Sequence, residues 1–198
     1  MRYKIYPTKS QLATLEEWNI LHCRLYNACL EQRITMYRQR GVSVGYNAQQ
    51  NELPALKAEF PEYKALGSQA LQETVRRVDR AYQAFFARVK RGDTAGFPRF
   101  KAARNYVGFC YPAKAGWKFE PGANGKHGKL TLSNLGMLKV RGVPRQWGEM
   151  RQLTLSKHAG EWYAVITIRC EVERWSGTFQ AGIDLGTEHV LSLSDDSD

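Results

Sequence analysis

The sequence lacks several features that would assign it a function at once. No stretch of its 198 residues approaches the roughly 20 apolar residues that span a bilayer, and the opening MRYKIYPTKS has no signal-peptide apolar core. The four cysteines form no C-x-x-C pair, and there is no Gly-rich P-loop and no Ser/His/Asp or Cys/His arrangement. We therefore expect a cytoplasmic protein with reduced thiols and no membrane partner, and zinc is not expected in this chain.

Positive charge is in excess and is unevenly distributed. The chain has 29 Lys and Arg against 19 Asp and Glu, a formal net charge of +10. Nine basic and three acidic groups lie in residues 67–105, and eleven and five lie in residues 106–180. Residues 181–198 hold five acids and no Lys or Arg. Such a basic body suits the neutralisation of phosphates, and the acidic end suits either a tail or the start of a carboxylate-rich catalytic unit.

Hydrophobic periodicity predicts helices in the first half of the chain. Residues 2–6 alternate as a short strand does, and Thr8 with Gln11 predicts a capping box that opens a helix to about residue 40, where Gly41 ends it. A second helix from about residue 47 is expected to break at Pro54. We expect Ser68 to cap a third helix, whose apolar face consists of Leu71, Val75, Val78, Tyr82, Phe85, Phe86 and Val89.

Near residue 105 the spacing of hydrophobic residues changes from a helical period of about 3.6 residues to the period of 2 that is typical of strands. This predicts strands at 106–112, 117–120, 129–133 and 137–141, and then a hairpin that turns at residues 158–160. The strand at 2–6 is too short to be stable alone, so we expect it to pair with this later sheet. Beyond Ser176-Gly177, AGIDLG and VLSLS predict an antiparallel hairpin that turns at residues 186–189.

Asp184 is a carboxylate within an otherwise apolar strand. Such a group is costly unless it is paired or binds a cation, and two-metal nucleases place an Asp of this kind on the central strand of an RNase-H-like sheet. Two other interpretations stay open. Asp184 could serve a turn at a strand end, and GIDLGT also resembles the phosphate-binding hairpin of actin-like ATPases, where it opens the domain.

Two regions carry residues suited to nucleic acid. The polar face of the third helix presents Gln69 and Gln72, which can reach base edges, beside three arginines that can reach phosphates, at 76, 77 and 80. The segment GFPRFKAARNYVGFCY (96–111) interleaves basic and aromatic groups, which suits phosphate contact and base stacking. The alternatives are a solvated helix face and a hinge whose aromatics, Phe97 and Phe100 in particular, fill the helix–sheet junction.

The order of these motifs resembles that of a known family. An N-terminal strand ending in YPT is followed by CRLYN (23–27), LPALKAEFP (53–61), SQALQETVRRVDRAYQAFF (68–86), GFPRFK (96–101), YVGFCYP and AGIDLG. This order is similar to the N-terminal half of TnpB, the transposon-encoded RNA-guided DNA nuclease related to small type V CRISPR effectors. The resemblance covers essentially the whole chain.

The resemblance implies an α+β layout in three parts. Residues 1–8 and 106–176 would form a wedge domain, an oligonucleotide-binding-like β-barrel, and residues 9–105 a helical recognition lobe inserted into it. Residues 177–198 would begin an RNase-H-like (RuvC) nuclease domain in which Asp184 ligates Mg²⁺ as the first catalytic carboxylate. Guide RNA and double-stranded target DNA would be the partners.

The resemblance also implies roles for individual residues. By their positions in the motifs, six residues would read a short DNA motif beside the target: Tyr46, Ser68, Gln69, Gln72, Cys110 and Tyr111. We expect the nucleic-acid backbone to be held by Lys4, Arg76, Arg77, Arg80, Arg99, Lys101 and Arg104.

The sequence departs from the family in one respect. The other RuvC acids and the zinc-ribbon cysteines lie beyond residue 198 in the family, so we do not expect this chain alone to cleave DNA. A truncation, or a second chain that supplies the rest, would account for the departure. The alternative functions are a nuclease-deficient binding module, acting as a repressor or a transposition accessory, and an actin-like ATPase fragment.

Overall fold

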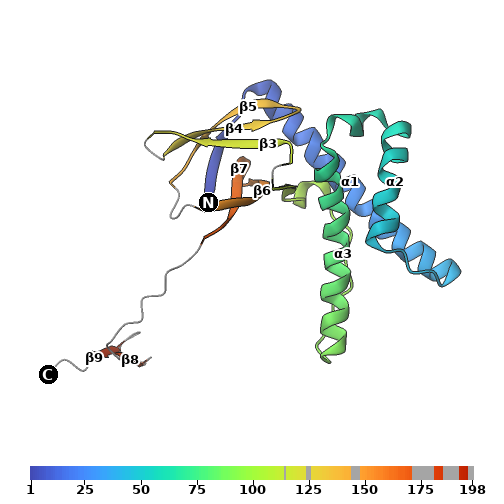
Figure 1. Ribbon diagram of the computed structural model, residues 1–198. Coiled ribbons are helices and arrows are strands. Elements are labelled where there is room, and N and C mark those ends of the chain that lie inside the picture. The colour runs from blue at the N-terminus through green and yellow to red at the C-terminus, as the bar shows by residue number, and fades with distance from the viewer. Residues whose placement is uncertain (114, 124–125, 144–147, 171–180, 185–191, 196–198) are drawn as a thin grey trace.

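A seven-stranded antiparallel sheet, curled into a half-barrel, forms one side of the molecule (Figure 1). The computed structural model describes residues 1–113, 115–123, 126–143, 148–170, 181–184 and 192–195. The strand order is β2-β6-β7-β1-β5-β4-β3. The strands are β1 (Arg2–Tyr6), β2 (Gly108–Pro112), β3 (Trp117–Pro121), β4 (His127–Leu132), β5 (Gly136–Arg141), β6 (Glu149–His158) and β7 (Glu161–Arg169).

Strand β1 occupies the centre of this sheet although it is the first element of the chain. Ile5 lies opposite Val140 of β5, and Tyr3 lies opposite Ala164 of β7, both in antiparallel register. The prediction that residues 2–6 pair with the later sheet is therefore confirmed. The outer strands β2 and β3 do not pair as neighbouring strands and are linked instead by a side-chain bond, in which Trp117 Nε1 donates to the Pro112 carbonyl at 2.8 Å. The expected barrel is therefore, in the described residues, an open half-barrel.

The helices follow β1 and form the other side of the molecule (Figure 1). The long helix α1 (Lys9–Arg40) begins with the predicted capping box, in which the Gln11 N–H donates to Thr8 Oγ1 and the Thr8 N–H donates to Gln11 Oε1. It ends at Gly41, whose φ of 65° is readily adopted by glycine. The remaining helical elements are α2 (Tyr46–Glu59), the 3₁₀ turn η1 (Pro61–Ala65), α3 (Ser68–Lys90) and the 3₁₀ turn η2 (Ala103–Asn105).

Two predictions about helix ends were wrong. Helix α2 continues through Pro54, which is exposed, while its neighbour Leu53 is buried. Packing of Leu53 outweighs the one backbone hydrogen bond that proline cannot donate. Ser68 is the first residue of α3 rather than its cap: Gly67 is the N-cap and provides no side-chain bond, and Ser68 Oγ instead accepts a hydrogen bond from Lys57 Nζ at 2.8 Å.

Phe109 of β2 joins the helices to the sheet. Its ring is fully buried and stacks on His22 of α1 at 4.5 Å between centroids. It also makes edge contacts with Trp18 at 6.4 Å and with Trp162 of β7 at 6.2 Å. Fully burying one such ring stabilises a fold by roughly 1.5–3 kcal/mol. The helical and β parts of the described chain therefore share one core.

The apolar face of α3 extends beyond this core. Leu71, Val75 and Val78 are completely buried, as predicted. About two to three turns beyond Val78, Phe86 is 60% exposed and Val89 is 52% exposed, because the end of α3 projects away from the sheet (Figure 1). The sequence pattern correctly predicted an apolar stripe, but only its first half is covered.

The predicted C-terminal hairpin is present. Strands β8 (Ala181–Asp184) and β9 (Ser192–Asp195) pair antiparallel, with Asp184 opposite Ser192. The predicted turn at 186–189 and the break at Ser176-Gly177 lie outside the described residues. No helix within the described part of the chain has the length and apolar character needed to cross a membrane.

Candidate nucleic-acid interface

The residues predicted to read a DNA motif converge where the start of α3 meets α2 and β2. Tyr46 opens α2 and contacts Arg76 of α3, while Cys110 of β2 contacts Arg77 of α3. Gly67, just before α3, lies so close to the Tyr111 ring that an added Cβ would be 3.3 Å from it. Three segments that are distant in the sequence are thus adjacent. The six predicted positions belong to this junction: Tyr46, Ser68, Gln69, Gln72, Cys110 and Tyr111.

These six positions differ in exposure. Ser68 and Gln69 are exposed, and Tyr46, Gln72 and Cys110 are partly buried. Tyr111 is only 4% exposed and makes an edge contact with Phe109 at 6.0 Å. Burial raises the pKa of the Tyr111 hydroxyl. Tyr111 therefore supports the junction from within and does not offer a surface to a ligand.

Arg76 is held in a defined position on the surface. Its Nη2 donates to the Tyr46 hydroxyl at 3.1 Å, and its guanidinium lies 5.0 Å from the centre of the Tyr46 ring. Nε lies 3.4 Å from Glu73 Oε1. The hydrogen bond to Tyr46, with the Glu73 charge, raises the pKa of Arg76 although partial burial opposes this. A fixed planar guanidinium of this kind suits bidentate contact with phosphate or a base edge.

Arg77 serves the interior, not the surface. Its Nη1 donates to the Gly108 carbonyl at 2.8 Å, its Nη2 donates to Cys110 Sγ at 3.4 Å, and it lies 5.2 Å from the centre of the Tyr106 ring. Gly108 has φ 144°, and a Cβ there would collide with the Leu155 carbonyl, so only glycine can present this acceptor. Of the three arginines predicted to contact phosphates, Arg76 and Arg80 are exposed and Arg77 is not.

His22 is a buried polar group beneath the junction. Its Nδ1 is 2.7 Å from Thr74 Oγ1, which itself donates to the Ala70 carbonyl at 3.2 Å. Since the Thr74 proton is used in that bond, His22 donates from Nδ1 and its Nε2 has no partner in the described residues. Burial, with the nearby Arg77 charge, lowers the pKa of His22 to about 3. The ring is therefore neutral and acts as a packing element.

A side-chain clamp holds the basic segment after α3. Asn27 of α1 donates from Nδ2 to the Lys101 carbonyl at 2.8 Å and accepts from the Lys101 N–H at 2.8 Å. Cys23 Sγ lies 3.3 Å from the same carbonyl. The motifs CRLYN and GFPRFK are thus joined, although 74 residues separate the two clamped positions. The sequence analysis did not predict the contact between Asn27 and Lys101. The presence of the motifs CRLYN and GFPRFK was the one feature of the sequence that could have indicated it.

The clamped segment presents cations to solvent. Arg99, Lys101 and Arg104 are exposed, and in the described parts of the chain none of them forms an ion pair with a carboxylate. Lys4 differs, because its ammonium is bonded to Glu161. Phe97, predicted to be structural, packs against Tyr82 at 5.5 Å yet is 47% exposed. Phe100, also predicted to fill the junction, is 54% exposed.

The sheet carries a second group of cations that sequence reasoning did not select. Lys129 of β4 lies directly opposite Lys139 of β5, and Arg141 lies between His127 and Lys4 in register. Lys129, Lys139 and Arg141 line an open hollow of about 780 Å³ together with Tyr6 and His127. Like charges directly opposite on neighbouring strands destabilise a sheet, and an anion would relieve that repulsion. The available signal was one lysine on the polar side of each alternating strand, in KLTL and in MLKV.

The described residues do not contain a metal centre. No group of three or more His, Cys, Asp or Glu side chains within them could hold a metal ion. Asp184 is described through its backbone at the end of β8 only. One carboxylate cannot bind the two ions of a hydrolytic nuclease site, so the described residues do not form such a site by themselves.

Comparison with known proteins agrees with the motif order. No protein-family profile matches the chain. Over 130 residues it is 30% identical to a protein described as "Putative RNA-guided DNA endonuclease InsQ" from Escherichia coli (strain K12). The match covers 65% of this chain and 30% of that protein, so the chain spans less than a third of its relative within the match. The chain is therefore a distant homologue of a TnpB-like RNA-guided DNA endonuclease.

Proposed function

We propose that this chain is the guide-RNA- and target-DNA-binding part of a TnpB-like RNA-guided DNA endonuclease. The observation that carries the proposal is the junction of α2, α3 and β2, where exposed amide and hydroxyl groups lie beside a positioned arginine. On the first turns of α3 Gln69 is exposed and Gln72 is partly exposed, and Arg76 lies one turn beyond Gln72. Amides that read base edges beside a cation that holds the backbone are a common arrangement in DNA recognition.

The proposal assigns a role to each part of the chain. The half-barrel sheet takes the role of the wedge domain, and α1 to α3 take that of the recognition lobe. Guide RNA follows the cations of the 99–104 segment, because these are exposed and unpaired in the described residues. Guide–target pairing supplies sequence specificity, while the protein reads only the short motif beside it. In the complete protein, Asp184 would be one Mg²⁺ ligand of the nuclease site.

Selection of DNA from a library with a randomised motif tests the proposal. The purified chain is loaded with the RNA that copurifies with it and is offered duplexes in which the bases beside the target vary. We expect enrichment of one short motif, and Gln72→Ala should weaken base preference at one position by about tenfold while total affinity changes little. Gln32→Ala is the matched control, since the Gln32 amide bonds to Glu52 and lies outside the six predicted positions.

Two outcomes would contradict the proposal. Failure of any RNA to copurify, together with no binding of guide-matched duplex, would remove it entirely. Enrichment that is identical for wild type and Gln72→Ala would leave nucleic-acid binding in place but would move motif reading away from the start of α3.

A further inference from the structure

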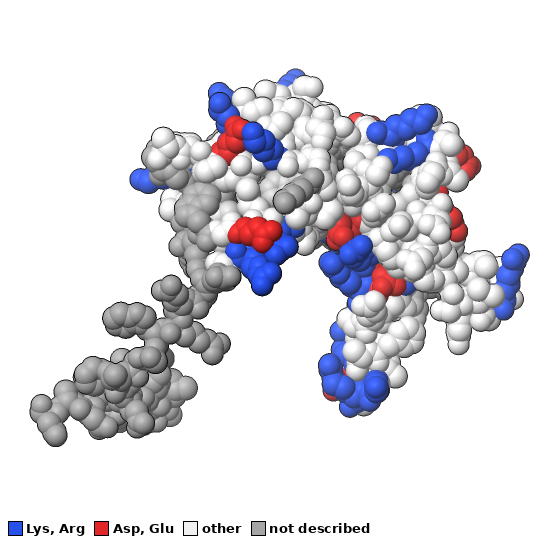
Figure 2. Space-filling model, in the orientation of Figure 1, with Lys and Arg blue, Asp and Glu red and all other residues white. Residues whose placement is uncertain are grey.

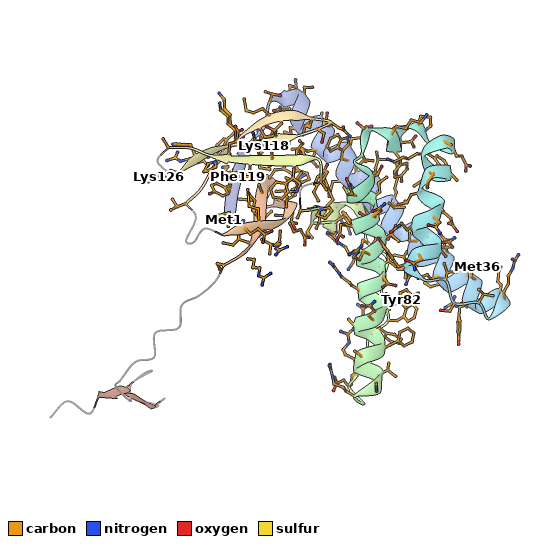
Figure 3. All side chains as sticks on the ribbon, in the orientation of Figure 1. Met1, Met36, Tyr82, Lys118, Phe119 and Lys126 are labelled. Atoms are coloured by element: carbon orange, nitrogen blue, oxygen red, sulfur yellow. The ribbon has the colours of Figure 1, made fainter. Side chains whose placement is uncertain are left out.

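The exposed end of the α3 apolar stripe faces a groove. A hollow of about 600 Å³ lies between the end of α1 and the end of α3, and the segment after α3 borders it. Figure 3 labels Met36 near the end of α1 and Tyr82 on α3, on the two helices that diverge around this groove. Its aromatic lining consists of Tyr37, Tyr82, Phe85, Phe86 and Phe97.

Some of these aromatic rings have faces that are accessible to solvent. Tyr37 is 67% exposed and Phe86 is 60% exposed, whereas Phe85 is partly buried. Phe97 braces Phe85 and Tyr82 by edge contacts at 5.3 and 5.5 Å between centroids. Large aromatics left this exposed next to one another cost free energy in water, so the arrangement favours a partner with flat apolar faces.

Charge identifies the type of partner. The groove is lined by Arg33, Arg38 and one carboxylate, Asp79, and because Asp79 pairs with Arg33, the excess positive charge among these described residues is that of Arg38. Arg33 is 7% exposed, pairs with Asp79 at 3.1 Å and lies 5.3 Å from the centre of the Tyr82 ring. Lys and Arg atoms gather at the free ends of α1 and α3 (Figure 2). A polyanion with stacking faces complements this surface better than a neutral apolar protein helix does.

We propose that this groove binds an unpaired segment of nucleic acid, with bases stacked on Tyr37 and Phe86 and phosphates near Arg38 and the end of α3. Aromatic platforms within a basic groove are the usual means of holding single strands without reading their sequence. Duplex bases are already stacked on one another and cannot enter. The inference rests on the proposed function, because it assigns one more contact to the same nucleic-acid ligand.

Fluorescence anisotropy on the full chain tests the groove, with short oligouridylate, oligothymidylate and a mixed-sequence duplex as probes. Phe86→Leu keeps apolar bulk but removes the stacking face, and Phe60→Leu is the matched control at an exposed phenylalanine outside the groove. We expect Phe86→Leu and Tyr37→Leu each to weaken single-strand binding by about tenfold and to leave duplex binding unchanged, with Phe60→Leu matching wild type. The two single-stranded probes show whether the segment is RNA or DNA.

A 2-aminopurine placed in the oligonucleotide gives a second readout, since its fluorescence falls when it stacks on a ring. Quenching by wild type but not by Phe86→Leu supports the inference. Equal single-strand affinity and equal quenching in both proteins would overturn it while nucleic-acid binding stands. Sedimentation that shows self-association lost in Phe86→Ala would assign the groove to a second copy of the chain. Absence of binding to all three probes would overturn the proposed function as well.

Discussion

At the scale of single residues, the candidate interface depends on side chains whose partners are distant in the sequence. Asn27 fixes Lys101, Tyr46 positions Arg76, and Gly108 offers its carbonyl to Arg77. Each contact depends on a particular residue type. Asn27 has both a donor and an acceptor on its amide, and Gly108 has no Cβ. Substitutions at these positions act through geometry and not through net charge.

His22 makes stability depend on pH. Its pKa is about 3 in the folded chain and near 6.5 when the ring is in water, because burial disfavours the charged form. The unfolded state therefore binds one more proton between these values. This group's contribution to the free energy of unfolding should fall as pH falls from about 6.5 towards 3, by about 1.4 kcal/mol for each pH unit.

Urea unfolding at several pH values between about 5 and 7.5 measures this slope while most carboxylates stay ionised. We expect His22→Gln to be less stable at neutral pH, because its amide is a poorer fit to the stacked position over Phe109. Its stability should vary less with pH than that of wild type. A slope that is the same in both proteins would show that His22 is not the group responsible.

At the scale of elements, each helix is defined by a local signal and stabilised by a non-local contact. The capping box sets the start of α1, and the first half of α3 is buried against α1 and β2. Helix α2 has the weakest local signals, since Gly45 gives no side-chain cap and Pro54 lies in its interior. It persists because Leu53 and Gln49 are buried.

Replacement of Pro54 by alanine should therefore stabilise the chain. The exposed position gains a backbone donor and loses the steric clash, for which the expected gain is about 1–3 kcal/mol. Pro61→Ala is the control, since Pro61 is at the start of η1, where the fixed φ of proline is favourable. Thermal unfolding should show a higher midpoint for Pro54→Ala alone. A lower midpoint for Pro54→Ala would mean that the helix needs the bend that proline imposes.

At the scale of the whole molecule, the net charge of +10 does not form one surface. Some cations are paired with carboxylates, such as Lys4 with Glu161 and Lys118 with Glu120. Others face solvent in the 99–104 segment, on strands β4 and β5, and at the ends of α1 and α3. Cations that are not already paired can replace the counterions of a polyanion, so these cations would govern how the proposed binding depends on salt.

We expect the affinity for RNA to fall steeply as salt rises. Changing Arg99, Lys101 and Arg104 together to alanine should reduce the slope of log K against log salt by about 2–3. Lys118→Ala is the control and should leave the slope unchanged, because its charge is already paired at 2.6 Å. Titrations across a salt series provide the measurement. The same slope for the triple variant and wild type would exclude the 99–104 segment from the phosphate contacts.

The sequence by itself determined most of the local structure. Alternation predicted the strands, Thr8 and Gly41 predicted both ends of α1, and motif order predicted the relation to RNA-guided endonucleases that the comparison confirmed. These properties depend on neighbouring residues, which is why a pattern reveals them. The errors at Pro54 and Ser68 arose where tertiary packing and a lysine from another helix outweighed local preference.

Only the tertiary structure decided which side chains are available to a ligand. It buried Tyr111 and engaged Arg77 internally, although the sequence places both beside plausible contacts. It also left Phe86 uncovered, while the same apolar stripe is fully buried at Val75. The physical reason is that the exposure of a side chain depends on which distant segments pack against its face of the helix or strand. A periodic pattern predicts which face is apolar, but it does not predict which segment covers that face.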